Sequence, residues 1–273
     1  MGKTDLNHEG VELTDTSAAK LRKLNLGAGV LHLITGVLML VLGDLDFDLP
    51  VSSFNISGPP GTALDNGVLA EQFGIPLAIG VAAFSLLSAF FHFLIALVVF
   101  PKYKSELRHG RNRFRWVEYA LSSTLMMVLI AATTGITDMA ALIALAFANI
   151  SMILFGWIME MVNSNEDVQR KNVWWSPFWM GCVAGIGPWL AILIPLWFNV
   201  SEEGAQGPPG FVYGIIVSIF FFFNTFAINQ WLQYRGKGRW ADYLHGERVY
   251  IILSFVAKSV LAWQIFANTL IPT

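Results

Sequence analysis

Seven long apolar segments run along the chain, and polar segments separate them. Each is about 20 residues long or longer, which is the length that an α-helix needs to cross the hydrocarbon core of a membrane. The pattern therefore predicts an all-α membrane protein with seven transmembrane helices, at residues 24–43, 73–100, 113–134, 139–159, 176–198, 211–233 and 249–270.

The same pattern predicts two parts of unequal size. Residues 1–23 form a polar N-terminal segment, and residues 24–273 form one seven-helix membrane domain, in which residues 44–72 are the loop between the first two helices. The N-terminal segment lacks the short apolar core and the cleavage site of a signal peptide. We therefore expect the first span to remain as a permanent anchor.

Composition supports a membrane protein and excludes several other classes. Of the 273 residues, 55% are hydrophobic and 13% are charged, whereas soluble domains have about 25% charged residues. The sequence shows no metal-binding cluster, phosphate-binding loop or nucleophile triad, so we predict no enzymatic activity and no nucleic-acid partner. The single cysteine, Cys182, excludes an intrachain disulfide.

Basic residues are confined to alternate connections. With the N-terminus in the cytoplasm, 16 of the 17 Lys and Arg residues lie in cytoplasmic segments, at 3, 20, 22, 23, 102, 104, 108, 111, 113, 115, 170, 171, 235, 237, 239 and 248. The connections on the other side hold no Lys or Arg. By the positive-inside rule this predicts a multi-pass protein of the cell membrane, in contact with lipid, with a cytoplasmic N-terminus and an extracellular C-terminus.

The remaining basic residue, Lys258, lies in the middle of the last apolar segment. It is ten residues from Arg248, or about 15 Å along a helix. A lysine at the centre of a membrane helix costs roughly 2.5 to 3.5 kcal/mol on insertion scales, so such a residue is a functional candidate and needs a partner.

Glu118 is the candidate partner for Lys258. If the third helix begins near Arg108, Glu118 is also about 15 Å from the cytoplasmic boundary. An alternative is an ion pair between Glu118 and Arg115 on the same helix, at i,i+3 spacing.

Two histidines and two serines lie at the same predicted depth. His32 is in the first helix and His92 in the second, both about 12 to 15 Å from the cytoplasmic boundary. Ser88 is one turn before His92, and Ser254 is one turn before Lys258, on the same helix faces. Each histidine alone is equally consistent with a structural role, but together these residues predict a polar, hydrated compartment on the cytoplasmic side of the lysine.

A lysine at this depth has two chemical uses. It can act electrostatically in a transporter, or it can form a Schiff base with a carbonyl ligand in an apolar pocket. The segments GPWL, IFFFFNTF and LAWQIF in the last three helices could line an aromatic slot for a long, planar, apolar ligand, which favours the second use.

Seven helices, a lysine in the last and a carboxylate in the third resemble a retinal protein. The segments that carry a closer resemblance are RWVEYALSS, SMILFGW, PGFVYGII, QYRGKGRW and GERVYIILSFVAKSVLAWQIF. They resemble the heliorhodopsins, a rhodopsin-like family of inverted topology, and the similarity extends over nearly the whole chain from about Lys20 onward. This resemblance implies a seven-helix, rhodopsin-like bundle.

The resemblance also implies roles for individual residues. All-trans retinal would be linked covalently to Lys258, with Glu118 as counterion and Arg115 one turn before it. Polar residues near the Schiff base would be His32, His92, Ser88, Ser123 and Ser254. The chromophore would be lined by Asn149, Met152, Gly156, Trp189, Phe223 and Gln230. The family further implies a homodimer, with strands in residues 44–72 at its interface.

We therefore expect a light-sensing photoreceptor with a protonated Schiff base that signals to an unidentified cytoplasmic partner. Outward proton pumps generally have a carboxylate four residues before the retinal lysine, where this chain has Ser254. The third helix also holds no acid or base after Glu118. The alternatives are a light-gated proton or ion channel, a light-driven transporter, and a non-photoactive seven-helix transporter that uses Lys258 and Glu118.

Overall fold

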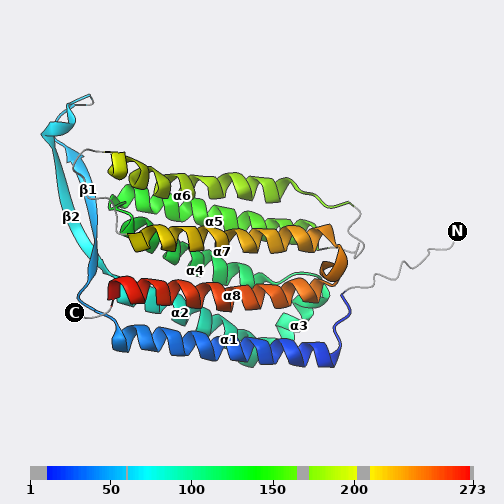
Figure 1. Cartoon of the computed structure of the whole chain (residues 1–273). Helices are drawn as coiled ribbons and strands as arrows, with labels where there is room; N and C mark the ends of the chain where they lie inside the picture. Colours follow the sequence, from blue (N-terminus) through cyan, green and yellow to red (C-terminus); the bar gives the residue numbers. More distant parts are fainter. Residues whose placement is uncertain (1–10, 60, 165–171, 202–209, 271–273) are drawn as a thin grey trace.

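The chain folds into a bundle of long helices with a β-hairpin at one end (Figure 1). The structure is a computed structural model, and it describes residues 11–59, 61–164, 172–201 and 210–270. In this part of the chain, seven helical spans are long and apolar enough to cross a membrane. The long helices are α1 (Asp15–Leu42), α2 (Leu77–Phe93), α4 (Arg113–Thr133), α5 (Met139–Val162), α6 (Ser176–Ser201), α7 (Gly210–Arg235) and α8 (Tyr243–Ile265).

Helix α1 begins earlier than hydropathy predicts. Its N-cap is Thr14, whose hydroxyl accepts a hydrogen bond from the Ser17 amide (3.2 Å). Such a cap satisfies one of the unpaired amides of the first turn. Residues 15–23, which the sequence assigned to the polar N-terminal segment, are therefore the first turns of α1; residues 1–10 of that segment lie outside the described part of the chain.

A hairpin of β1 (Asp48–Ile56) and β2 (Gly67–Pro76) follows α1, and the strands pair antiparallel. The strands expected from the family resemblance are thus present. Residues 73–76, predicted to be helical, belong to β2. The hairpin is attached to the bundle where the Ser52 amide donates to the Thr137 carbonyl (2.9 Å) and the two hydroxyls hydrogen bond (2.9 Å). Leu49 and Val51 are buried in the bundle core.

The end of α2 leads into an element that the hydrophobic pattern does not predict. A π-helical turn (Leu94–Val98) leads into a short helix, α3 (Phe100–Arg108), which the apolar pattern does not reveal because its exposed face is charged. A turn then separates α3 from α4, whose N-cap is Asn112. The predicted start of the third transmembrane span at residue 113 is therefore confirmed, and the alternative start near Arg108 is wrong.

Helix α8 begins at Tyr243, six residues before the predicted start at residue 249. Its N-cap is Asp242, whose carboxylate accepts from the Leu244 amide (2.8 Å). The early start places Glu247 inside the helix. The remaining helical turns are Leu64–Asn66 between the strands, Gly238–Ala241 before α8 and Phe266–Leu270 after α8.

Buried apolar residues form two separate clusters along the bundle. One, toward the hairpin, includes Met39, Phe84, Met126 and Leu261. The other, toward α3, includes Leu21, Ile95, Tyr103, Leu107 and Ile251. Along each of α1, α2, α4 and α8, the polar residues His32, Ser88, His92, Glu118 and Lys258 lie between the two clusters. The bundle therefore contains a polar layer enclosed by apolar packing on both sides.

Candidate functional site

Lys258 and Glu118 form a buried ion pair in this polar layer. The Lys258 Nζ donates to Glu118 Oε1, to Ser88 Oγ (2.7 Å) and to Ser122 Oγ (2.9 Å). Lys258 and Glu118 are each only 5% exposed. The depth argument from the sequence is thus correct for this pair, although its assumed helix start is not.

Two serines fix the geometry of the pair. Ser88 on α2 also donates to Glu118 Oε1 (2.7 Å), so it bridges both charges. Ser122 lies four residues after Glu118, on the same helix face, a spacing that could have identified it from the sequence. Ser123, which the resemblance named, instead accepts a hydrogen bond from Asn149 (2.9 Å).

Burial makes the Lys258–Glu118 pair strong and obligatory. Two unit charges about 4 Å apart attract by roughly 4 kcal/mol at an effective dielectric constant of about 20. Removing one partner of a buried pair costs about 3 to 5 kcal/mol, because the other charge remains without compensation. The pair therefore ties α8 to α4 at the centre of the bundle.

The two histidines lie next to each other beside the ion pair. Their rings stack with centroids 5.5 Å apart, and His92 Nδ1 hydrogen bonds Asn25 Oδ1 (2.8 Å). His92, Asn25, Ser254 and Glu118 line a small polar cavity of about 30 Å³. One ordered water needs about 10 to 15 Å³ by this measure, so the cavity is large enough for water, as the predicted hydrated compartment requires.

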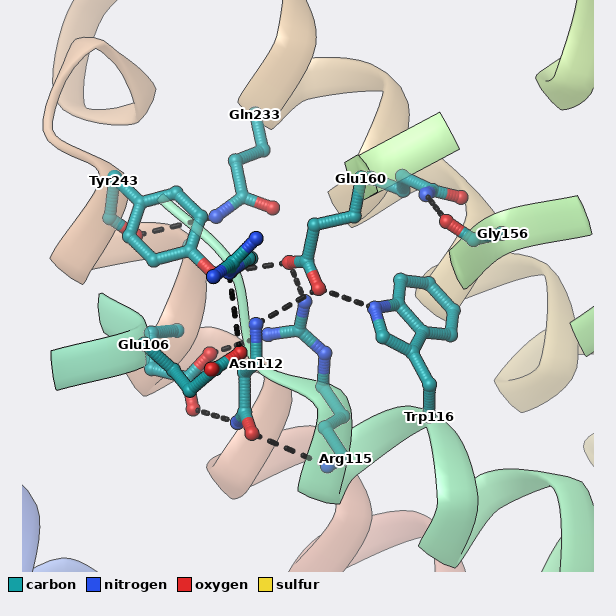
Figure 2. Close-up of polar contacts among 12 residues, drawn as sticks. Glu106, Asn112, Arg115, Trp116, Gly156, Glu160, Gln233 and Tyr243 are labelled. Atoms are coloured by element: carbon teal, nitrogen blue, oxygen red, sulfur yellow. Dashed lines mark hydrogen bonds and ion pairs between the residues drawn. The ribbon is translucent and has the colours of Figure 1, made fainter. Parts of the chain in front are cut away.

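Arg115 does not pair with Glu118, so the alternative from the sequence is wrong. Its guanidinium donates through Nη1 to Glu247 Oε2 and through Nη2 to Glu160 Oε1. All three side chains are at most 4% exposed. Figure 2 shows Arg115 and Glu160 directed toward each other within a dense set of polar contacts.

Neutral donors surround the two carboxylates. Glu160 accepts from the Tyr243 hydroxyl (2.9 Å), the Asn112 amide (2.8 Å) and the Trp116 indole (Figure 2). Glu247 accepts from the Asn112 side chain (2.7 Å) and the Tyr103 hydroxyl (2.9 Å). Burial, and then the Glu247 carboxylate, raise the pKa of Tyr103 well above its ordinary value, so this phenol keeps its proton and donates. We call Arg115, Glu160 and Glu247 with these donors the arginine cluster.

The sequence missed the arginine cluster for a specific reason. The hydrophobic pattern puts Glu247 outside the last span and Glu160 at the end of the fourth, so it does not indicate that either is a buried partner of Arg115. Asp242 is an acidic residue just before an apolar helix and is a typical N-cap. Starting the helix after Asp242 would have placed Glu247 inside the bundle.

A large apolar cavity of about 470 Å³ opens beside Lys258. Among the expected chromophore-lining residues, Met152, Gly156, Trp189, Phe223 and Gln230 all line it, together with Lys258 and Ser123. Asn149 is not among the residues that line the cavity, but it donates to Ser123, which is. The Trp189 ring packs edge-to-face on Phe223, with centroids 5.6 Å apart.

Glycines allow aromatic and thioether side chains to approach the helices around this cavity. A Cβ on Gly156 would lie 2.5 Å from the Trp116 ring, and a Cβ on Gly185 would lie 2.5 Å from the Met152 sulfur. Either side chain would have to move if a larger residue replaced the glycine. The result is an apolar cavity with an amine at its wall, which is suited to a Schiff base with an apolar carbonyl compound.

Comparison with known families decides the class of this site. Residues 21–270 match the model of the family described as Heliorhodopsin. The chain belongs to the heliorhodopsins. It is therefore a multi-pass membrane protein of the retinal-binding, photoreceptor type, and membership implies a retinal chromophore.

The rhodopsin-like fold also has a counterpart among solved structures. The transmembrane domain of the Salpingoeca rosetta rhodopsin phosphodiesterase matches with a TM-score of 0.64 and 12% identity, over 92% of this chain and 86% of that chain. At this identity the match shows the fold alone. A search of the curated proteins finds no match.

The residues of this heliorhodopsin fit retinal. The cavity volume of about 470 Å³ lies within the usual range of roughly 300 to 1,000 Å³ for small-molecule sites. Its wall is mainly aromatic and aliphatic, which suits a polyene, and Lys258 supplies the amine. Glu118 lies beside that amine and could balance a positive charge on it.

If the arginine cluster is buried and paired as described, replacing Arg115 should lower stability far more than replacing Arg113, which is on the same helix. Arg115→Gln would leave two buried carboxylates without their cation and is expected to lower stability by about 3 to 5 kcal/mol. Arg113→Gln is the control, because Arg113 pairs with Glu106 but its side chain is 43% exposed; the expected loss is about 1 kcal/mol or less. Thermal unfolding in detergent measures both, and equal losses would contradict a buried cluster.

Proposed function

We propose that the chain is a light sensor in which all-trans retinal is linked to Lys258 as a protonated Schiff base. The observation that carries the proposal is the buried Lys258–Glu118 ion pair at the wall of a 470 Å³ apolar cavity. Family membership supports retinal as the ligand. The proposal assigns no enzymatic reaction to the chain.

Glu118 is the proposed counterion. The Lys258 amine has three acceptors, namely Glu118, Ser88 and Ser122. A protonated Schiff-base nitrogen carries a single N–H, so it can keep only one of these bonds at full strength. Glu118 is the charged acceptor, and hydrogen bonds to charged groups are the stronger ones, so it would hold the proton on the nitrogen.

Retinal, when bound, supplies light absorption and a photoisomerisation that reorients the nitrogen. The chain's own residues then determine where a proton can go. Toward α3, the polar cavity beside Glu118 presents His92, Ser254 and Asn25, with His32 stacked on His92. Toward the hairpin, α4 continues from Ser123 to Thr133 without an acid or a base. We infer that the proton is exchanged on the α3 side.

This asymmetry supports sensing over pumping. Net transport needs proton-binding groups on both sides of the Schiff base. Ser254 occupies the position where outward pumps generally have a carboxylate, and its hydroxyl makes no hydrogen bond with the described residues. The arginine cluster joins α4 to α3 through Tyr103 and Glu247, which gives a route from the Schiff base to the surface helix α3.

A cytoplasmic signalling partner is the proposed receiver of this change. The described basic segments, which are the first turns of α1, helix α3 and the connection between α7 and α8, lie at the end of the bundle opposite the hairpin (Figure 1). We propose that this end is cytoplasmic, which puts the N-terminus inside the cell and the C-terminus outside, because the positive-inside rule favours that orientation.

A homodimer through the hairpin is also part of the proposal. Val68 and Leu69 on β2 are 60% and 66% exposed, and Leu64 in the turn is 71% exposed. The hairpin that carries these residues extends beyond the ends of the helices (Figure 1). A second copy would remove them from water.

Peptide mapping tests the linkage on the unaltered protein. After reconstitution with all-trans retinal, borohydride reduction under light should fix a retinyl group on the peptide that contains Lys258. The other lysines, such as Lys237, serve as internal controls and should stay unmodified. A retinyl group elsewhere would overturn the assignment, and a protein that never binds retinal would favour the non-photoactive transporter.

Light-induced pH changes separate a sensor from a pump or a proton channel. Cells that express the protein with retinal should show no sustained change in external pH on illumination, with or without a protonophore. An established outward proton pump in the same cells provides the positive control. A light-dependent pH change that the protonophore abolishes would contradict the sensor.

One cysteine variant tests orientation and dimer together. In a Cys182→Ala background, Val68→Cys places the sole cysteine on the hairpin. A membrane-impermeant bis-maleimide added to intact cells should link two copies. Absence of any labelling would contradict an extracellular hairpin, whereas labelling without cross-links would contradict the hairpin dimer.

A further inference from the structure

Two cations from different helices gather at one aromatic ring where α1, α2 and α3 meet. Arg22 of α1 donates through Nε to the Ala96 carbonyl (2.8 Å) in the π-helical turn. Its guanidinium carbon lies 5.2 Å from the centroid of the Phe100 ring, and the Lys104 ammonium lies 5.7 Å from the same centroid. The two cations therefore share one aromatic ring.

These two charges have no carboxylate partner among the residues that the structure describes. The ion pairs in this region involve Glu106, which binds Arg111 and Arg113 instead. The Phe100 ring offsets part of the repulsion through cation–π attraction. An anion between or beside the two cations would complete the compensation, and arginine and lysine together are suited to a phosphate group.

The surface next to these cations is apolar and faces outward. Leu97 and Val98, in the π-helical turn that precedes α3, are 58% and 70% exposed, and Val30 of α1 is 47% exposed. A position for a phosphate group thus adjoins a surface suited to hydrocarbon chains. This combination matches a phospholipid better than a free phosphate ion, which would use the cations alone.

We propose that the junction of α1, α2 and α3 binds an anionic phospholipid, with its phosphate at Arg22 and Lys104 and its acyl chains along Val30, Leu97 and Val98. Figure 1 shows α3 and the N-terminal half of α1 at the same end of the bundle. The lipid would stabilise the angle between α2 and α3. The site does not depend on retinal or on light, so it stands apart from the photoreceptor function.

Lipid selectivity in vesicles tests the site. The full-length protein is reconstituted in phosphatidylcholine vesicles that carry trace spin-labelled phosphatidylglycerol or spin-labelled phosphatidylcholine, and the motionally restricted fraction of each is measured in the dark. Attraction by two interfacial cations predicts a preference for phosphatidylglycerol of about fivefold or more. The variant Arg22→Gln/Lys104→Gln should bring the two lipids close to parity.

A matched control separates a site from the general basic field. Lys20→Gln/Lys23→Gln removes the same charge from exposed positions of α1 and should retain the preference. Equal loss in both variants, or no preference in the unaltered protein, would overturn the proposal. Displacement of the restricted lipid by inorganic phosphate at constant ionic strength would also overturn it, in favour of a free-phosphate site.

A measurement that does not require retinal checks that the variants still fold. Thermal unfolding in detergent compares both double variants with the unaltered protein. If Arg22→Gln/Lys104→Gln fails to fold, Arg22→Lys keeps the charge but loses the planar guanidinium. This variant should lower the preference for phosphatidylglycerol only in part, and an unchanged preference would count against a phosphate at Arg22.

Discussion

The buried ion pair between Lys258 and Glu118 constrains the rest of this bundle. Neither charge is tolerable alone at this depth, so α8 and α4 must keep their faces together, and Ser88 brings α2 into the same contact. The surrounding architecture follows from enclosing this pair. Apolar clusters enclose it toward the hairpin and toward α3. A small cavity with space for water lies beside Glu118 and His92.

The arginine cluster adds a second buried electrostatic contact one turn along α4. Arg115 precedes Glu118 by three residues, so a movement of α4 that disturbs one contact strains the other. Glu247 connects the cluster to α8, which also carries Lys258. The two contacts therefore share the same pair of helices, and Tyr103 extends the connection to α3. The small cavity that Glu118, Arg115 and Glu247 line lies between the two contacts.

Much of this could be predicted from the sequence, because hydrophobic length and charge count are strong signals. The seven spans and the pairing of Lys258 with Glu118 follow from them. Capping residues set the true helix ends, and the caps Thr14 and Asp242 begin two helices earlier than hydropathy predicts. Contacts between distant helices, such as Glu247 with Arg115, depend on how those helices pack, and hydropathy does not contain that information. The resemblance indicates Ser123 as the serine of α4 near the Schiff base, whereas helical spacing from Glu118 favours Ser122, which accepts from Lys258.

The most direct test of the account is the visible absorption spectrum of Glu118→Gln reconstituted with all-trans retinal. A carboxylate beside a protonated Schiff base stabilises the charge that excitation moves away from the nitrogen. Neutralising Glu118 should therefore shift the maximum to longer wavelength, or abolish the visible band if the nitrogen loses its proton, while Glu118→Asp should stay close to the unaltered protein. An unchanged maximum in Glu118→Gln would contradict the proposed counterion.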